Sequence, residues 1–136
     1  MIVRPMNPEY RLTRFISSPP PGGFPMRFGV ITACNPHGRI VTEEQNAAAT
    51  AKLLQHLIET EMALFPVTGC SPDSAHREPG FGITCEAPEI VELGRVWQQE
   101  AVFWVEGGIV HLVPCCAGES AVLGTWANLL YSSPTE

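Results

Sequence analysis

Hydrophobic and polar positions along the chain follow two different periods, and their order predicts a mixed α+β protein. Short runs rich in apolar and β-branched residues predict strands at 28–33, 63–68, 81–85 and 101–105. The segment 43–59 has no glycine or proline, and its apolar residues recur three and four positions apart, which is typical of an amphipathic helix. Strands and helices therefore alternate through the middle of the chain.

The helix predicted at 43–59 has both a start signal and an apolar side. Thr42 followed three residues later by Gln45 is a capping-box pattern, in which two side chains satisfy free backbone amides. The apolar row and the residues beside it are Ala47, Ala51, Leu54, Ile58, Thr50, Leu53 and Leu57. A second helix is predicted to begin near Pro88 and to end around 98–100. Each helix needs a sheet or another helix to cover its apolar side.

Turn residues predict which strands pair. Glu106-Gly107-Gly108 separates apolar runs at 101–105 and 109–113, which is the pattern of a tight β-hairpin. A weaker strand at 10–16 is separated from the strand at 28–33 by a loop rich in proline and glycine, and we expect these two strands to form a hairpin. Pro66 has no amide to donate, so it favours an edge position for its strand.

Without the outer strands, the order of elements is β-α-β-β-α-β, the order of a ferredoxin-like two-layer sandwich. We therefore expect an α+β fold with a mainly antiparallel sheet, two helices on one face, an extra N-terminal strand and a C-terminal hairpin strand. The length of 136 residues predicts a single domain over 1–136. Residues 117–136 are expected to form a C-terminal tail without chemistry.

Composition narrows the classes of partner. The formal charge of −6 argues against a nucleic-acid partner, which requires a clustered basic surface. No run of about 18 apolar residues is present to span a membrane. The chain also begins without the apolar run of a signal peptide. The five cysteines form no C-x-x-C pair, which favours reduced thiols over a disulfide framework. A cytoplasmic location is expected.

Unusual polar residues gather in two segments that prolines and glycines punctuate, 34–39 and 69–82. In the predicted topology, the strands that precede these segments run parallel, joined by a right-handed helical crossover. Both segments then emerge at one edge of the sheet and form a polar cleft. The candidate site residues at this edge are Asn35, His37, Arg39, Asn46, Asp73, His76, Arg77, Glu78 and Gln99.

The candidate residues divide by their chemistry. Asp73, His76 and Glu78 are candidates for acid–base or hydrolytic catalysis, because a carboxylate beside a histidine orients the ring and raises its pKa. His37, Arg39 and Arg77 are candidates for binding a carboxylate or phosphate, together with the start of the 43–59 helix. Asn35, Asn46 and Gln99 could hold a polar ligand by neutral hydrogen bonds.

The same segments raise two further possibilities, a metal and a cofactor. The potential metal ligands Cys34, His37, Cys70, Asp73, His76 and Glu78 lack the close spacing of a zinc site, so no metal is assigned. A covalent role for the thiols of Cys34 or Cys70 stays open. No P-loop or dinucleotide fingerprint is present, and the cofactor is left unknown.

Several short motifs occur in a fixed order along the chain. They are Ile31-Thr32-Ala33-Cys34-Asn35-Pro36-His37-Gly38, a helix with Asn46, Gly69-x-Ser71-Pro72-Asp73-x-x-His76-x-Glu78, and Gln99-x-Ala101-x-Phe103-Trp104. Over about residues 10–115, this combination resembles the small bacterial proteins grouped as the domain of unknown function 3293 family. The resemblance implies a cytoplasmic bacterial protein, and it carries no established activity.

The residues and the resemblance together predict a protein that binds a small polar or anionic ligand in the cleft, with acid–base or hydrolytic chemistry left open. The alternative is a protein-interaction or dimerisation module without catalytic activity, because exposed edge strands can pair with a second copy. Apolar residues within 123–131 could then serve as a docking segment.

Overall fold

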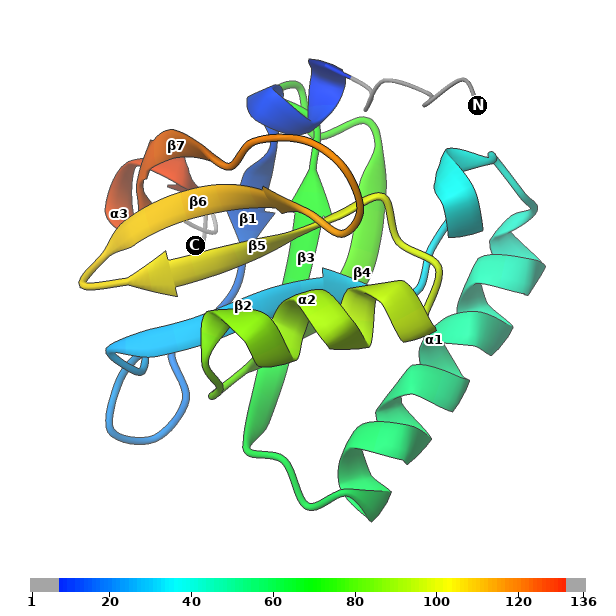
Figure 1. Cartoon of the computed structure of the whole chain (residues 1–136), viewed down its shortest axis with the longest axis horizontal. Helices are drawn as coiled ribbons and strands as arrows, with labels where there is room; N and C mark the ends of the chain where they lie inside the picture. The colour runs from blue at the N-terminus through cyan, green and yellow to red at the C-terminus, as the bar shows by residue number, and fades with distance from the viewer. Residues whose placement is uncertain (1–7, 132–136) are drawn as a thin grey trace.

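The computed structural model describes residues 8–131, and its centre is an eight-stranded sheet in the order β7-β6-β5-β2-β4-β3-β1-β8 (Figure 1). The strands are β1 (Arg14–Ile16), β2 (Arg27–Thr32), β3 (Leu64–Cys70), β4 (Arg77–Ile83), β5 (Ala101–Glu106), β6 (Ile109–Pro114), β7 (Ala121–Thr125) and β8 (Leu130–Tyr131). The helices are α1 (Glu43–Glu59), α2 (Ala87–Val96) and α3 (Trp126–Leu129), with 3-10 turns η1 (Pro8–Leu12) and η2 (Pro36–Gly38). Neighbouring strands are antiparallel except β1 and β8.

The α+β class and the mainly antiparallel sheet are therefore confirmed. The middle of the sheet has the order β5-β2-β4-β3, so β2 and β3 run in the same direction with β4 between them. The narrower assignment to a ferredoxin-like two-layer sandwich stays a prediction, because the sheet continues on both sides of these strands and curls around a second core.

Two hydrophobic cores lie on opposite faces of the sheet. On one face, α1 and α2 cover a core in which Leu53, Leu57 and Ile90 pack with Ile31 and Ile83 (Figure 1). Large side chains rather than the predicted alanine row face the sheet, because leucine buries more apolar area than alanine. Ala47, Ala51 and Ile58 of the predicted apolar row are exposed.

The second core fills the concave face of the sheet. Phe15 of β1 meets Phe103 of β5 with ring centroids 5.1 Å apart, although three strands separate β1 from β5 in the sheet order. Trp126 of α3 packs on Phe15 and Phe28, with ring centroids 5.0 and 5.1 Å away. Strands distant in the sheet order can share one core only if the sheet curls, and this curl creates a hollow near β1.

The two hairpin predictions have opposite outcomes. The β5–β6 hairpin is confirmed, with Gly107 and Gly108 at φ values of 57° and 80°, as a tight turn requires. The hairpin expected between the first strand and β2 is wrong, because β1 pairs with β3 and β8. Phe24 in the intervening loop packs on Phe65 and Trp126, so the loop crosses the concave face instead of reversing beside β1.

The segment 69–82 was predicted to be a loop, but most of it is strand. β3 and β4 pair from Leu64–Ile83 to Cys70–Arg77, which leaves only residues 71–76 as the tip of a hairpin. Pro66 does not place β3 at the sheet edge. The short β1 pairs with β3 only at residues 68–70, so β1 does not extend alongside Pro66. Because no strand of the described residues lies on that side of Pro66, its missing amide removes no hydrogen bond between strands.

Residues 121–131 belong to the sheet, although the sequence assigned them to a tail. β7 and β8 sit at its two ends, and α3 between them buries Trp126 and Leu129 in the concave core. Residues 132–136 of the predicted tail lie outside the described residues, as do 1–7. Within the described part of the chain, no helix is long and apolar enough to cross a membrane.

Candidate functional site

A cavity of about 320 Å³ opens where β2 ends at Thr32. This volume lies at the lower end of the range for small-molecule sites. Its apolar wall is formed by Leu12, Phe15, Val30, Ile40, Ala101 and Phe103. Its polar lining includes Glu9, Tyr10, Thr13, Thr32, Asn35, Ser71, His76, Glu78 and Gln99. The cavity thus has an apolar body and a polar end built from segments far apart in the sequence.

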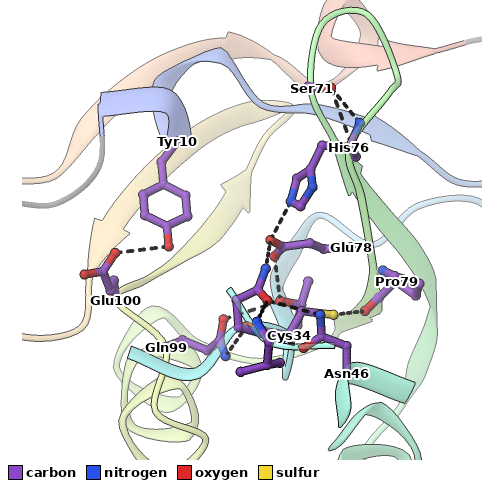
Figure 2. A network of polar contacts seen from close by, with 12 residues as sticks. Tyr10, Cys34, Asn46, Ser71, His76, Glu78, Pro79, Gln99 and Glu100 are labelled. Atoms are coloured by element: carbon purple, nitrogen blue, oxygen red, sulfur yellow. Dashed lines mark hydrogen bonds and ion pairs between the residues drawn. The ribbon is translucent and has the colours of Figure 1, made fainter. Parts of the chain in front are cut away.

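Glu78 is the centre of the polar end (Figure 2). Its Oε1 accepts a hydrogen bond from the Thr32 hydroxyl at 3.2 Å, and its Oε2 accepts from Asn35 Nδ2 at 3.1 Å. His76 Nε2 lies 3.0 Å from the same Oε2. These contacts join the ends of β2 and β4, so the two polar segments meet as the sequence predicted.

Asn35 clamps the loop after β2 in a left-handed conformation, with φ 47° and ψ 63°. Asparagine tolerates this region better than most residues because its short side chain can hydrogen-bond locally. Its Oδ1 accepts from the Val41 amide and from Asn46 Nδ2, each at 3.1 Å. Asn46 Oδ1 in turn accepts from the Asn35 amide at 2.8 Å. Helix α1 therefore fixes the position of Asn35, which in turn contacts Glu78.

Gln99 lies in the segment between α2 and β5 and forms the floor of the polar end. Its Nε2 donates to the carbonyls of Cys34 and Trp97, both at 3.2 Å. Its Oε1 lies 3.3 Å from the Thr32 hydroxyl, which shares its single hydrogen between Gln99 and Glu78. The side-chain amide is thus fully oriented by the backbone.

The contact between His76 and Glu78 determines the tautomer of the ring. An ionised carboxylate only accepts hydrogen bonds, so the neutral imidazole carries its proton on Nε2. Nδ1 then holds a free lone pair, and the His76 side chain is 63% exposed. The His76 amide donates to Ser71 Oγ at 3.0 Å, which anchors the backbone beneath the ring. This geometry suits a general base.

Tyr10 and Glu100 form a second polar pair across the cavity from His76 (Figure 2). The Tyr10 hydroxyl donates to Glu100 Oε1 at 3.2 Å. Burial, followed by the negative charge of Glu100, raises the pKa of Tyr10 well above its usual value. The Glu100 carboxylate lies directly against Gly38, where an added Cβ would be 2.6 Å from Oε1. Gly38 therefore provides the space that the carboxylate occupies.

The predicted site residues divide into those that line the cavity and those that do not. Asn35, His76, Glu78 and Gln99 line it. Asn46 lies behind Asn35 as a support.

The other predicted residues are outside the lining. Asp73 is fully exposed and accepts from Ser71 Oγ and the Ala75 amide, so it caps the hairpin tip. Arg77 donates to the Ser74 carbonyl and hydroxyl, and His37 and Arg39 are exposed.

The thiols considered as nucleophiles are buried. Burial raises the pKa of Cys34 and that of Cys70, which disfavours the reactive thiolate. Cys34 Sγ lies 3.9 Å from Thr50 Oγ1 and 3.8 Å from the Pro79 carbonyl. Among residues 8–131, no three His, Cys, Asp or Glu side chains are grouped closely enough to hold a metal ion.

Sequence reasoning missed Tyr10, Thr32 and Glu100. Thr32 had a usable signal, since it is a polar residue at the end of a buried strand and precedes an Asn-Pro turn. Tyr10 had none, because a strand was predicted from Tyr10 onward, whereas it lies within the 3-10 turn η1, and its partner Glu100 is 90 positions away.

The fold and the cavity define a small α+β protein with a polar site at one sheet edge. The chain belongs to the family described as "Protein of unknown function (DUF3293)", whose model matches residues 31–102. The resemblance seen in the sequence is thereby confirmed over a shorter range. The matched range contains Thr32, Asn35, Glu78 and Gln99, but not Tyr10. No curated protein and no solved structure matches the chain.

Proposed function

We propose that the chain binds a small polar ligand in the cavity beside Thr32 and that His76, held by Glu78, acts on it as a general base. The observation that carries this proposal is the junction of an apolar-walled cavity with a polar end whose side chains are oriented by one another. Sites that bind small molecules combine these two features.

The donor and acceptor roles at His76 support the catalytic part of the proposal. Glu78 orients the ring from one side, and the Ser71 hydroxyl fixes its backbone, so Nδ1 is the group left to take a proton. The buried thiols are poor nucleophiles for the reason given above. A proton taken from the ligand itself or from a water molecule is the chemistry that this arrangement favours.

The structure changes which ligands are favoured. His37, Arg39 and Arg77 were the expected side-chain donors to an anionic group, and none of them lines the cavity. The expectation of a polar ligand therefore has stronger support than the expectation of an anionic one. A cytoplasmic location and a ferredoxin-like relationship of the β5-β2-β4-β3 core belong to the same proposal.

The binding proposal is tested by screening a fragment library against ¹⁵N-labelled protein and mapping the amide shifts. We expect the shifts to cluster on residues that line the cavity, including Gly69 and Gln99. Ala101→Leu fills the cavity and should abolish them, whereas Ala63→Leu at an exposed position should not. Shifts of equal size in wild type and Ala101→Leu would refute binding at this site.

The catalytic proposal is tested with His76→Gln. Glutamine keeps a hydrogen-bond donor for Glu78 but cannot act as a base. We expect a fragment that binds wild type to bind the variant as well, while any chemical conversion seen in the ligand's own spectrum is lost. Conversion that persists in His76→Gln would exclude the assigned base. Asp73 is not replaced in this test, because its side chain caps the hairpin tip and a substitution there would disturb the loop that carries His76.

The interaction alternative is supported by one feature, the strand β7 at the end of the sheet. Its Val122 side chain is 65% exposed. Pairing of this edge with a second copy would bury that side chain. We expect a concentration-dependent dimer in light scattering that Val122→Lys abolishes, and a chain that stays monomeric at high concentration contradicts the alternative.

A further inference from the structure

The polar end of the cavity has few free donors. The Tyr10 hydroxyl donates to Glu100, and the Thr32 hydroxyl donates to Glu78 and Gln99. Both hydrogens of the Gln99 side-chain amide go to backbone carbonyls.

The remaining hydroxyls of the lining also donate to acceptors within the protein. Those of Ser71 and Thr13 donate to Asp73 and to the Tyr10 carbonyl. Every hydroxyl in the lining is thus committed to an acceptor within the protein.

Acceptors, in contrast, remain available. His76 Nδ1 has a free lone pair because Nε2 faces Glu78. A carboxylate offers about four lone-pair positions, and Glu78 uses three of them for Thr32, Asn35 and His76. The Tyr10 oxygen donates its only hydrogen and keeps its acceptor capacity. Asn35 Nδ2 gives one of its two hydrogens to Glu78, so acceptors outnumber donors at this end and favour a ligand that supplies hydrogen-bond donors of its own.

The charges at the polar end have one sign. Glu9 and Glu78 line the cavity, and the Glu100 carboxylate lies just behind Gly38 and Tyr10, which line it as well. Among the residues that the structure describes, no lysine or arginine lines the cavity. An anionic group placed at the polar end would face the carboxylates of Glu78 and Glu100 with little to compensate it, whereas a cation would be attracted by both.

The rest of the cavity fits an apolar or aromatic body. Phe15 and Phe103 contribute aromatic rings to its wall, and Val30 and Leu12 add aliphatic surface.

Resting on the proposed function, we propose that the ligand of this cavity is a small amine: a protonated amino group that donates to Glu78 and His76, attached to an apolar body of limited size. The available acceptors, the two carboxylates and the apolar wall each select for one part of such a molecule. The amine is held as a cation by Glu78 and Glu100 together.

The test uses three probes of similar shape and different charge: 2-phenylethylamine, 2-phenylethanol and 3-phenylpropionate. Each is titrated into ¹⁵N-labelled protein at pH 7, and the amide shifts of Gly38, Gly69 and Gln99 are followed. We expect the amine to bind at least about tenfold more tightly than the alcohol, as a charge-assisted hydrogen bond provides. The carboxylate should bind most weakly.

Two variants check that the charge preference comes from this site. Glu100→Gln keeps an acceptor for Tyr10 but removes a charge, and it should raise the Kd of the amine about threefold or more. Glu119→Gln removes the same charge from an exposed position and should leave the Kd unchanged.

The outcomes separate this inference from the proposed function. If the alcohol or the carboxylate shifts the same amides and binds as tightly as the amine, the amine inference is overturned and the binding site stands. If neither these probes nor the fragment screen shifts the amides of the lining residues, both proposals are overturned. A preference for the amine that Glu119→Gln reduces as much as Glu100→Gln also overturns the inference, because it reflects net charge alone.

Discussion

The replacement Asn35→Ala gives the most direct test of how the polar end is held together. The substitution removes the hydrogen bonds from Asn35 Nδ2 to Glu78 and from Val41 and Asn46 to Asn35 Oδ1. It also leaves alanine in a left-handed conformation that the asparagine side chain helps to stabilise. Both effects act on the loop that connects β2 to α1.

The expected loss of stability follows from these contacts. Each hydrogen bond contributes about 1 kcal/mol net, and the left-handed backbone costs alanine about 1 kcal/mol. Because the contacts are only partly buried, we expect Asn35→Ala to lower the free energy of unfolding by about 3 kcal/mol. For a chain of this length, that corresponds to a fall in Tm of roughly 10 °C.

Urea denaturation followed by circular dichroism measures the effect, and two further variants divide it. Asn35→Gly removes the same hydrogen bonds without the backbone penalty, so it should be more stable than Asn35→Ala by roughly 1 kcal/mol. Asn35→Asp keeps the acceptor but sets a second carboxylate against Glu78. Its stability relative to wild type should therefore recover as the pH is lowered and one carboxyl group becomes protonated.

Asn128→Ala is the matched control, because Asn128 is an exposed asparagine in α3. Its stability should stay within about 0.5 kcal/mol of wild type. A loss below about 1 kcal/mol for Asn35→Ala, or a loss no larger than that of Asn128→Ala, would refute the role of Asn35 as a clamp. An Asn35→Asp variant with wild-type stability at neutral pH would refute the contact with Glu78.

Three further predictions concern a titration, a thiol and a close approach. Because burial and Glu100 raise the folded-state pKa of Tyr10, wild type should lose stability relative to Tyr10→Phe as the pH rises above about 10, measured by urea denaturation. Ellman's reagent should label one thiol of the folded chain rapidly, that of exposed Cys116, and Cys116→Ser should remove this phase; fast labelling of a second thiol contradicts the burial of the other four. Gly80→Ala would place a Cβ 2.3 Å from the Ile31 carbonyl oxygen and should cost about 2–3 kcal/mol in urea denaturation, whereas Gly69→Ala, with 3.8 Å of clearance, should cost far less.

Local signals in the sequence predicted several elements well. The capping box at Thr42 and Gln45 forms both of its hydrogen bonds at the start of α1. Gly107-Gly108 makes the tight turn of the β5–β6 hairpin. The helix between β2 and β3 predicts that the two strands run in the same direction, and this topology predicts that Asn35 and Glu78 lie close together. In each case, the information lies within a few residues or in one crossover rule.

Other features depend on contacts that no local pattern encodes. The segment 69–82 has the composition of a loop, yet it is mostly strand, because β2 and β3 offer partners on both sides of β4. Asp73 has the chemistry of a catalytic residue, but its hydrogen bonds within the hairpin tip turn it away from the cavity. Tertiary pairing overrode composition in the first case, and local geometry overrode residue type in the second.

The pattern of residues was enough to predict the α+β class, the two long helices, the family and the sheet edge at which polar residues gather. The curl of the sheet could not be predicted in this way, because it depends on aromatic contacts between distant strands, such as that of Phe15 with Phe103. The curl forms the cavity, and it also decides which residues line it. Tyr10 and Glu100 meet there across 90 positions, and a contact of that range is set by the fold rather than by any period in the sequence.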